Sequence, residues 1–241
     1  MGGRLPNTSV SRVRFDQVKN ESTPKRRSQP KPVVLSGAVT AEDEYQVAAA
    51  LTARRAVLDR ALGQLSLDPA AITDAARLLV RTLAERHKVL AAGNGGSAAE
   101  AQHFAAELVG RFKKERNAYA VVSLVADSSV LTALGNDYGY SEVFARQVEA
   151  LGSDGDLLIA FSTSGESENL IRAAEAARRF GLSVIAVTGG KPNRLERLAD
   201  VAVRMPALDV DAIQELQTVA THILCGIAEA QLSPADGSSA R

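Results

Sequence analysis

The chain of 241 residues has one cysteine, no tryptophan and few aromatic residues, which make up 4% of it. The single cysteine, Cys225, excludes an internal disulfide and is typical of proteins from the reducing cytoplasm. No apolar run approaches the roughly 18–20 residues that a membrane-spanning helix needs, and no signal-peptide core follows the N-terminus. The formal net charge is zero, so nothing global predicts binding to nucleic acid or to a membrane surface. We therefore expect a cytoplasmic protein.

The N-terminal segment, residues 1–38, differs in composition from the rest of the chain. Pro, Ser and Asn are frequent, no hydrophobic period is sustained, and eight basic residues stand against Asp16 and Glu21. This composition cannot bury enough apolar surface to offset the entropy of ordering, which predicts a disordered basic tail. The tail is either a solvated extension or an electrostatic tether to something anionic. We also expect residues 234–241 to be disordered, which leaves residues 39–233 as the folded domain.

Within this domain, helical patterns alternate with short apolar runs. Apolar residues make up 46% of the chain, enough for a sizeable core. Two helical patterns come before the first apolar run: one is capped by Thr40, and the other is capped by Asp68 with Pro69 at the first helical position. Strands joined by helices imply right-handed crossovers, and so we predict an α/β fold with a five-stranded parallel sheet flanked by helices. The predicted strands are 88–92, 119–125, 156–161, 183–187 and 200–204, and the later helices are 97–113, 128–151 in two pieces, 167–180, 192–198 and 211–231.

The segment FSTSGESEN, residues 161–169, follows the third predicted strand and starts a helix. Ligands of parallel sheets bind beyond the carboxyl ends of the strands. Unpaired N–H groups at a helix N-terminus bind phosphate without any lysine, and Gly165 lets the backbone approach closely. Ordinary helix capping would explain one hydroxyl, whereas four of them predict a phosphomonoester site. The four hydroxyl donors are Ser162, Thr163, Ser164 and Ser167.

The loop after the first predicted strand, GNGGSA at residues 93–98, satisfies the dinucleotide fingerprint G-x-G-x-x-A. That fingerprint also requires an acidic residue about 20 residues further on, at the end of the next strand. The nearest candidate, Asp127, lies well beyond that spacing. A nicotinamide enzyme would also leave the hydroxyl-rich loop unexplained. We therefore expect no nucleotide cofactor.

Two histidines are candidates for chemistry. His103 and Glu107 lie four residues apart on the helix after the glycine loop, so both side chains share one face. Such a pair can bind a divalent metal or act as acid and base, although an isolated pair of this kind is most often only a polar surface pair. His222 lies on the last predicted helix, within about 80° of Gln214 around the helix axis. A lone helical histidine is more often structural.

Four separated motifs resemble, in order, those of the phosphoheptose isomerases in the sugar isomerase (SIS) superfamily. They are GNGGSAAEAQHFAAEL, GNDYGYSEVF, FSTSGESENL and IQELQTVATH. The resemblance covers roughly residues 45–232 and implies a single SIS domain. It also implies an enzyme that interconverts sedoheptulose 7-phosphate with D-glycero-D-manno-heptose 7-phosphate, as a homotetramer with active sites at subunit interfaces.

The resemblance assigns roles residue by residue. It implies that Glu107 is the catalytic base and His222 the catalytic acid, which suffice to move a proton between two carbons through an enediol. The ligands that it implies for one zinc ion per subunit are His103, Glu107, Gln214 and His222. The substrate-binding residues that it implies are Asn94, Gly95, Gly96, Ser97, Asn136, Asp137, Ser162, Thr163, Ser164, Ser167 and Gln214.

The chain departs from the family pattern in places. The pattern has arginine where Ala212 stands and histidine where Gln217 stands, and the loop of residues 189–192 is shorter than usual. These departures leave the exact substrate preference open. The basic tail is not part of the pattern.

Two readings from other functional classes remain open at this point. A close relative within the superfamily is a non-catalytic tetramer that binds the bacterial replication initiator, and we expect such a binder to lack the pair Glu107 and His222. A phosphosugar sensor would need a further partner domain, for which a tail of this length is too short.

Removal of residues 1–38 tests the interpretation of the tail. Because its composition does not favour packing, we expect the truncated chain to keep its melting temperature and its activity nearly unchanged. Thermal unfolding and turnover of the two forms would be compared side by side. A large loss of either quantity would show that the tail docks on the domain or completes a site.

Overall fold

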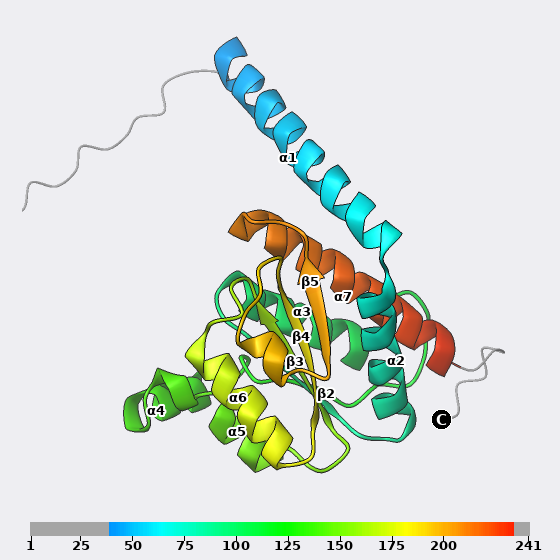
Figure 1. Ribbon diagram of the computed structural model, residues 1–241, viewed down its shortest axis with the longest axis vertical. Helices are drawn as coiled ribbons and strands as arrows, with labels where there is room; N and C mark the ends of the chain where they lie inside the picture. The colour runs from blue at the N-terminus through cyan, green and yellow to red at the C-terminus, as the bar shows by residue number, and fades with distance from the viewer. Residues whose placement is uncertain (1–38, 234–241) are drawn as a thin grey trace, which may run out of the picture. The chain divides into compact units, whose positions relative to one another are not determined.

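The computed structural model describes residues 39–233, so the predicted tails at residues 1–38 and 234–241 lie outside the described residues (Figure 1). None of the described helices is long and apolar enough to cross a membrane. The elements, with 3-10 helices written η, are α1 (Ala41–Leu67), α2 (Ala70–Ala84), β1 (Val89–Gly93), α3 (Gly96–Val109), β2 (Val121–Ser123), α4 (Ser128–Asp137), η1 (Tyr140–Glu142), α5 (Ala145–Leu151), β3 (Leu157–Ser162), α6 (Glu168–Arg179), β4 (Ser183–Gly189), η2 (Leu195–Leu198), β5 (Val201–Met205) and α7 (Val210–Leu232).

The five strands form one parallel sheet in the order β2-β1-β3-β4-β5, which confirms the predicted α/β fold. β1 therefore pairs with β2 on one side and with β3 on the other. The chain leaves the centre of the sheet in one direction after β1 and returns in the other at β3. This reversal of direction is the topological switch point at which open α/β sheets bind ligands.

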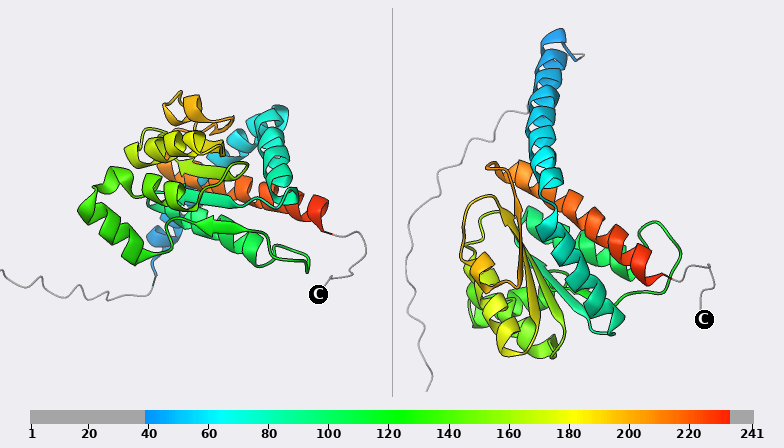
Figure 2. Two further views of the ribbon diagram at one scale, coloured as in Figure 1. Left: turned by 90° about the horizontal axis from the view of Figure 1, so that it is seen from below. Right: turned by 45° about the vertical axis from the view of Figure 1, so that its right-hand side comes forward.

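Helices cover both faces of the sheet (Figures 1 and 2). Alternate residues of β1 belong to different cores: Val89 and Ala91 pack with α2, α3 and α7, whereas Leu90 and Ala92 pack with α5 and α6. All five residues of β1 and all six of β3 are buried, as expected for strands covered on both faces. The face covered by α3 and α7 carries the predicted acid–base residues.

Several boundaries differ from the predictions. α2 begins at Ala70, with Pro69 in the capping position and no side-chain capping bond, one residue later than predicted. Residues 192–198 form only the short 3-10 helix η2. The predicted helix 97–113 was wrong at its end, because α3 stops at Val109 and the chain then bends away. Its continuation is prevented by contacts to α7, which the periodicity of the sequence does not contain.

Candidate active site

The loops that follow β1 and β3 contain most of the predicted ligand residues. The two strands pair directly, with Gly93 opposite Phe161, so the loops lie side by side. Asn94 and Asn169 exchange two side-chain hydrogen bonds of 2.9 Å each, and Tyr140 donates its hydroxyl proton to Asn94 Oδ1 at 3.2 Å. These bonds join the glycine loop, the start of α6 and η1 into one rim.

Glycines in the first loop allow two close approaches of neighbouring elements. A Cβ on Gly93 would lie 2.2 Å from the carbonyl oxygen of Ser97, so only glycine lets α3 begin so near the end of β1. A Cβ on Gly96 would lie 2.4 Å from Nε2 of Gln214 on α7. Gly95 between them has a φ of +56°, a conformation that side chains disfavour. The side chain of Gln214 thus lies directly over this loop.

Gln217 has a structural partner in the same loop. Its buried side chain accepts a hydrogen bond from Ser97 Oγ at 2.8 Å and donates one to the carbonyl oxygen of Val187 at 3.1 Å. The amide therefore ties the glycine loop to β4 through α7, which accounts for a glutamine at this position. Ala212 is fully buried in the core.

The hydroxyl-rich loop, residues 162–167, leads from β3 into the N-terminus of α6. The buried Ser162 accepts a hydrogen bond through Oγ from the Gly165 N–H at 3.0 Å, and Ser164 accepts one from the Glu166 N–H at 3.2 Å. Ser167 occupies the capping position of α6 but makes no capping hydrogen bond. The hydroxyl of Ser167 therefore lies beside the first turn of α6 without a hydrogen bond to its backbone N–H groups.

The segment before η2 supports this loop from behind. Leu195 donates its N–H to the carbonyl oxygen of Gly165 at 3.0 Å, and Arg194 donates its N–H to Glu166 Oε1 at 2.9 Å. Gly165 has a φ of +67°, and a Cβ there would lie 2.1 Å from Cγ of Asn193. Asn193 is itself 3% exposed and hydrogen-bonded to Thr188 and Glu196. The loop is therefore fixed in shape without a ligand.

His103, Glu107 and His222 come together from α3 and α7. The two Nε2 atoms of His103 and His222 lie 2.9 Å apart, and Nδ1 of His103 lies 3.7 Å from Glu107 Oε1. One ligand atom from each of the three residues lies within 4.8 Å of the others. Two imidazole nitrogens turned toward each other beside a carboxylate suit either a shared proton or a divalent cation.

A cavity of about 520 Å³ opens beside this cluster, between the first turns of α3 and of α7. His103 and Gln214 line it together, next to Gly96 of the glycine loop. His103, the glycine loop and Gln214 thus share one concave surface, whereas Glu107 and His222 lie close to His103 without lining the cavity. The full lining is Gly96, Ala99, Glu100, His103, Asp211, Gln214, Glu215 and Thr218.

Comparison with known proteins assigns the chain to a family. A family model described as the SIS domain matches residues 53–189. A phosphoheptose isomerase from Helicobacter pylori (strain P12) is 49% identical over 152 residues, which are 63% of this chain and 79% of that protein. The chain belongs to the phosphoheptose isomerases of the SIS superfamily. It is therefore an isomerase, which decides against the non-catalytic readings of its motifs.

Solved structures of the same family superpose on this isomerase over nearly their full length. A phosphoheptose isomerase from Neisseria gonorrhoeae is 38% identical with a TM-score of 0.70, over 78% of this chain and 98% of that one. One from Francisella tularensis is 35% identical with a TM-score of 0.73, over 77% and 98%. The described fold is thus the fold of the family.

Two further residues predicted to contact the sugar lie at the end of α4. Asn136 and Asp137 are both exposed, and Asn136 Nδ2 donates a hydrogen bond to Asp137 Oδ1 at 2.8 Å. Among residues 39–233, no hydrogen bond connects either side chain to the glycine loop or to the histidine cluster. Asp127, which was weighed as a ribose ligand, instead caps α4 by accepting from the N–H groups of Ser129 and Val130.

Sequence reasoning missed Glu100, a buried carboxylate in the isomerase cavity. It is 7% exposed, its Oε2 accepts from Thr218 Oγ1 at 2.6 Å, and its Oε1 has no hydrogen-bond partner among the described residues. Glu100 precedes His103 by three residues and Glu107 by seven, so all three share one helix face. That spacing is a signal by which the sequence could have indicated it.

Sequence reasoning also missed Phe112, which is partly buried in the bend after α3. Its ring stacks on His222, with 5.5 Å between ring centroids and an angle of 27° between ring planes. No local pattern signals this contact, because it joins residues 110 positions apart in the chain.

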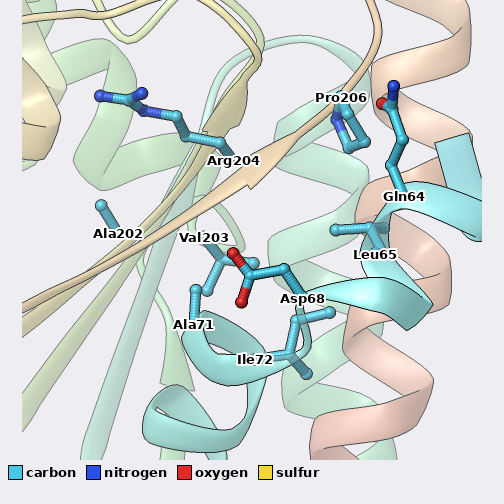
Figure 3. Close-up of a pocket in the computed structure, with 9 residues that line it drawn as sticks. All are labelled: Gln64, Leu65, Asp68, Ala71, Ile72, Ala202, Val203, Arg204 and Pro206. Atoms are coloured by element: carbon cyan, nitrogen blue, oxygen red, sulfur yellow. The ribbon is translucent and has the colours of Figure 1, made fainter.

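A second cavity of about 520 Å³ lies between the turn from α1 to α2 and the edge strand β5 (Figure 3). Asp68 lines it with mostly apolar neighbours, and the guanidinium of Arg204 extends away from Asp68. Arg204 is bound instead to both oxygens of Glu196, at 2.7 Å each. None of the predicted site residues lines this cavity.

Cys225 is fully buried in the core beside α3, as predicted. Burial, reinforced by the nearby charge of Glu107, raises the pKa of its thiol to about 12. The thiol therefore stays protonated and is no nucleophile.

Replacement of Gly165 tests the shape of the hydroxyl-rich loop, with Gly139 as a matched control. Both glycines have positive φ, but a Cβ on Gly139 would meet nothing within 4 Å. We expect Gly139→Ala to lower the free energy of unfolding by about 1–3 kcal/mol, because its φ of +87° and ψ of +154° lie in a backbone region that is essentially restricted to glycine. Gly165→Ala should cost clearly more, because its methyl group also displaces Asn193. Denaturant unfolding of both variants measures the difference, and equal losses would show that Asn193 gives way freely.

Proposed function

We propose that this isomerase interconverts sedoheptulose 7-phosphate with D-glycero-D-manno-heptose 7-phosphate. The observation that carries the proposal is the convergence of His103, Glu107 and His222 beside a cavity at the switch point of the sheet. The family supports a phosphorylated heptose as the substrate, because the curated relatives are named phosphoheptose isomerases. The glycine loop, Asn136 and Asp137 would contact the sugar hydroxyls.

The hydroxyl-rich loop would hold the phosphate of the substrate. Ser162, Thr163, Ser164 and Ser167 surround the N-terminus of α6, where backbone N–H groups and the helix dipole favour an anion. No lysine or arginine lies within residues 161–169. Recognition would therefore depend mainly on neutral donors, although Lys191 lines the same pocket as Thr163 and Ser164.

Glu107 and His222 would carry out the proton transfers. With the ketose bound, Glu107 takes the proton from C1 while His222 gives a proton to the oxygen on C2, which produces the enediol. Return of the carbon-bound proton to C2, with loss of the proton from the oxygen on C1, gives the aldose. Both groups regain their starting states, so the reaction needs no oxidant or reductant.

One zinc ion per subunit would fit the same cluster. His103, Glu107 and His222 offer ligand atoms of the kinds that zinc prefers, and Gln214 lies on the same side of α7. These four residues would hold the ion. When bound, it would supply a Lewis acid that stabilises negative charge on the enediolate oxygens.

We further propose a homotetramer with active sites at subunit interfaces. α1 has 27 residues, yet Ala61 is its one buried residue, and Tyr45 and Leu51 are 70% and 66% exposed. A groove lined mainly by apolar residues of α1, α2 and α7 continues this surface and includes Ile223, the neighbour of His222. Burying these side chains against further copies of the chain would also shield the exposed His222 from water.

The setting that we propose is the cytoplasm, with no nucleic-acid partner. The single thiol and the near balance of charges support this setting. The substrate is then a soluble metabolite, which reaches the open cavity by diffusion.

Single alanine substitutions test the phosphate site. We expect Ser164→Ala to weaken phosphosugar binding by about 10- to 150-fold, since a hydrogen bond to a charged group contributes about 1.5–3 kcal/mol. Ser153→Ala is the matched control, because this exposed serine lies before β3, at the opposite end of the strand. The Michaelis constant and melting temperature of each variant give the comparison. Unchanged kinetics in Ser162→Ala, Ser164→Ala and Ser167→Ala alike would refute the site.

Conservative changes test the acid–base pair. Glu107→Gln keeps the side-chain shape and His222→Asn keeps a smaller polar side chain, but each removes the proton-carrying group, so each should cut turnover at least about 100-fold. The double variant should be little worse than the worse single variant, because both groups serve one relay. Glu85→Gln and His87→Asn, which lie before β1 and away from the cavity, should keep turnover.

A second measurement decides the reaction itself. The wild-type protein, with zinc supplied, should exchange the C1 proton of sedoheptulose 7-phosphate with solvent deuterium. If no exchange occurs, the proposed substrate is wrong. If exchange occurs and either variant at position 107 or 222 keeps most of its turnover, the assigned mechanism is wrong.

A further inference from the structure

The bend between α3 and β2, residues 110–120, is held by a carboxylate on α7. Glu229 is 3% exposed and accepts hydrogen bonds from three successive backbone N–H groups. Its oxygens lie 3.1 Å from the nitrogen of Phe112, 2.9 Å from that of Lys113 and 3.0 Å from that of Lys114. Glu229 also lies two helical turns after His222, so both project from one face of α7.

Arg116 completes this attachment from within the bend. Its side chain is buried, and Nε lies 3.4 Å from Glu229 Oε1. Burial alone would raise the pKa of Glu229, but the three N–H donors and the charge of Arg116 outweigh it and hold that pKa below its usual value. The guanidinium also donates to the carbonyl oxygens that end α3, those of Glu107, Leu108 and Gly110, and to that of Asn117, at 2.7–3.1 Å.

This pair therefore joins the end of α3, which carries Glu107, to the last turn of α7, two turns beyond His222. The last carbonyl groups of a helix have no partner within the helix, and here one guanidinium binds several of them. The two helices that supply the base and the acid are thus linked by a single buried ion pair.

Phe112 is the residue that the attached bend presents to the active site. Its ring stacks on His222 and approaches the position of Gly226, where a Cβ would lie 3.4 Å from Cε1 of Phe112. His222 and Gly226 are one helical turn apart, so the ring lies along α7 and covers one face of the imidazole. The ammonium of Lys113 lies 4.9 Å from the centroid of the same ring.

We propose that Phe112 is a positioning residue for His222, and that the Arg116–Glu229 pair holds Phe112 in place. The flat ring limits rotation of the imidazole about its side-chain torsions and keeps Nε2 directed toward His103 and the cavity. Because the ring has no polar atom, it acts only through His222. The inference rests on the proposed role of His222. It adds Phe112, a residue that the proton transfers themselves do not require.

Substitutions that separate the volume of Phe112 from its flat face give the test. Phe112→Leu and Phe112→Met keep apolar bulk but remove the ring, and we expect each to lower kcat about 10- to 100-fold with less than about threefold change in KM. Phe112→Tyr keeps the ring and should restore kcat to within about threefold of the wild type. Phe180→Leu, at a ring that is 42% exposed at the end of α6, is the control for loss of an aromatic side chain.

A spectroscopic measurement makes the test independent of activity. The chain has three histidines, so the resonances of His222 in histidine-labelled protein are assigned by their loss in His222→Asn. Removal of the stacked ring in Phe112→Leu should shift the His222 ring-proton resonances by several tenths of a ppm, whereas Phe180→Leu should leave them in place. Arg116→Lys keeps the charge but lacks the planar fork, and it should shift the same resonances and lower kcat in the same direction.

The outcomes are separable. If Phe112→Leu and Phe112→Met shift the His222 resonances but leave kcat unchanged, the positioning role is wrong. It is also wrong if both variants lower KM, kcat and the melting temperature together. If the resonances do not move, the stacking itself is wrong. An unchanged Arg116→Lys variant overturns the part assigned to the ion pair. If the wild-type protein is inactive on the heptose but Phe112→Leu still shifts the His222 resonances, the proposed function is refuted and the contact between Phe112 and His222 stands.

Discussion

Parallel pairing of β1 with β3 is the constraint on which the rest of the site depends. The two strands are separated in sequence by β2, by three α-helices and by the 3-10 helix η1, yet they align residue for residue from Val89 with Leu157 to Gly93 with Phe161. Their carboxyl ends therefore coincide, and so do the N-termini of α3 and α6. A glycine loop alone would be a weak motif, and a cluster of hydroxyls alone would be a good helix cap. Because the glycine loop and the hydroxyl-rich loop lie side by side, they border one candidate site.

The third border of this candidate site depends on a different contact, the packing of α7 across α3. Both helices lie on the same face of the sheet and contribute to one core. Two side-chain contacts fix the register of α7 against α3: Gln217 binds Ser97 in the N-terminal half of α7, and Glu229 binds the bend near its C-terminal end. His222 lies between these two fixed points. The position of His222 relative to α3 is thus determined by contacts of other side chains.

Much of the fold could be predicted from the sequence, because its signals are local. Each strand is a short apolar run and each crossover helix has its own hydrophobic period. The five strands and their parallel direction could therefore be predicted from the pattern alone. Glu107 and His222 were reached only through the resemblance, since no local rule brings residues so far apart together. The end of α3 was mispredicted for a physical reason. The carboxylate of Glu229 binds the N–H groups of residues 112–114, and Arg116 binds the last carbonyl groups of α3, so the chain leaves the helix after Val109. The contacts of Phe112 and Gln217 could not be predicted either, because both join α7 to segments far away in the sequence.

The burial of Cys225 has a practical side. The chain contains no other cysteine, and this one lies in the core with its thiol protonated at any physiological pH. Alkylating reagents and mild oxidants attack thiolates that they can reach, and this sulfur offers neither charge nor access. The folded protein therefore behaves toward such reagents as if it were free of cysteine. A cysteine introduced on its surface would be the one reactive position, ready for a spin label or a fluorophore without prior removal of the native thiol.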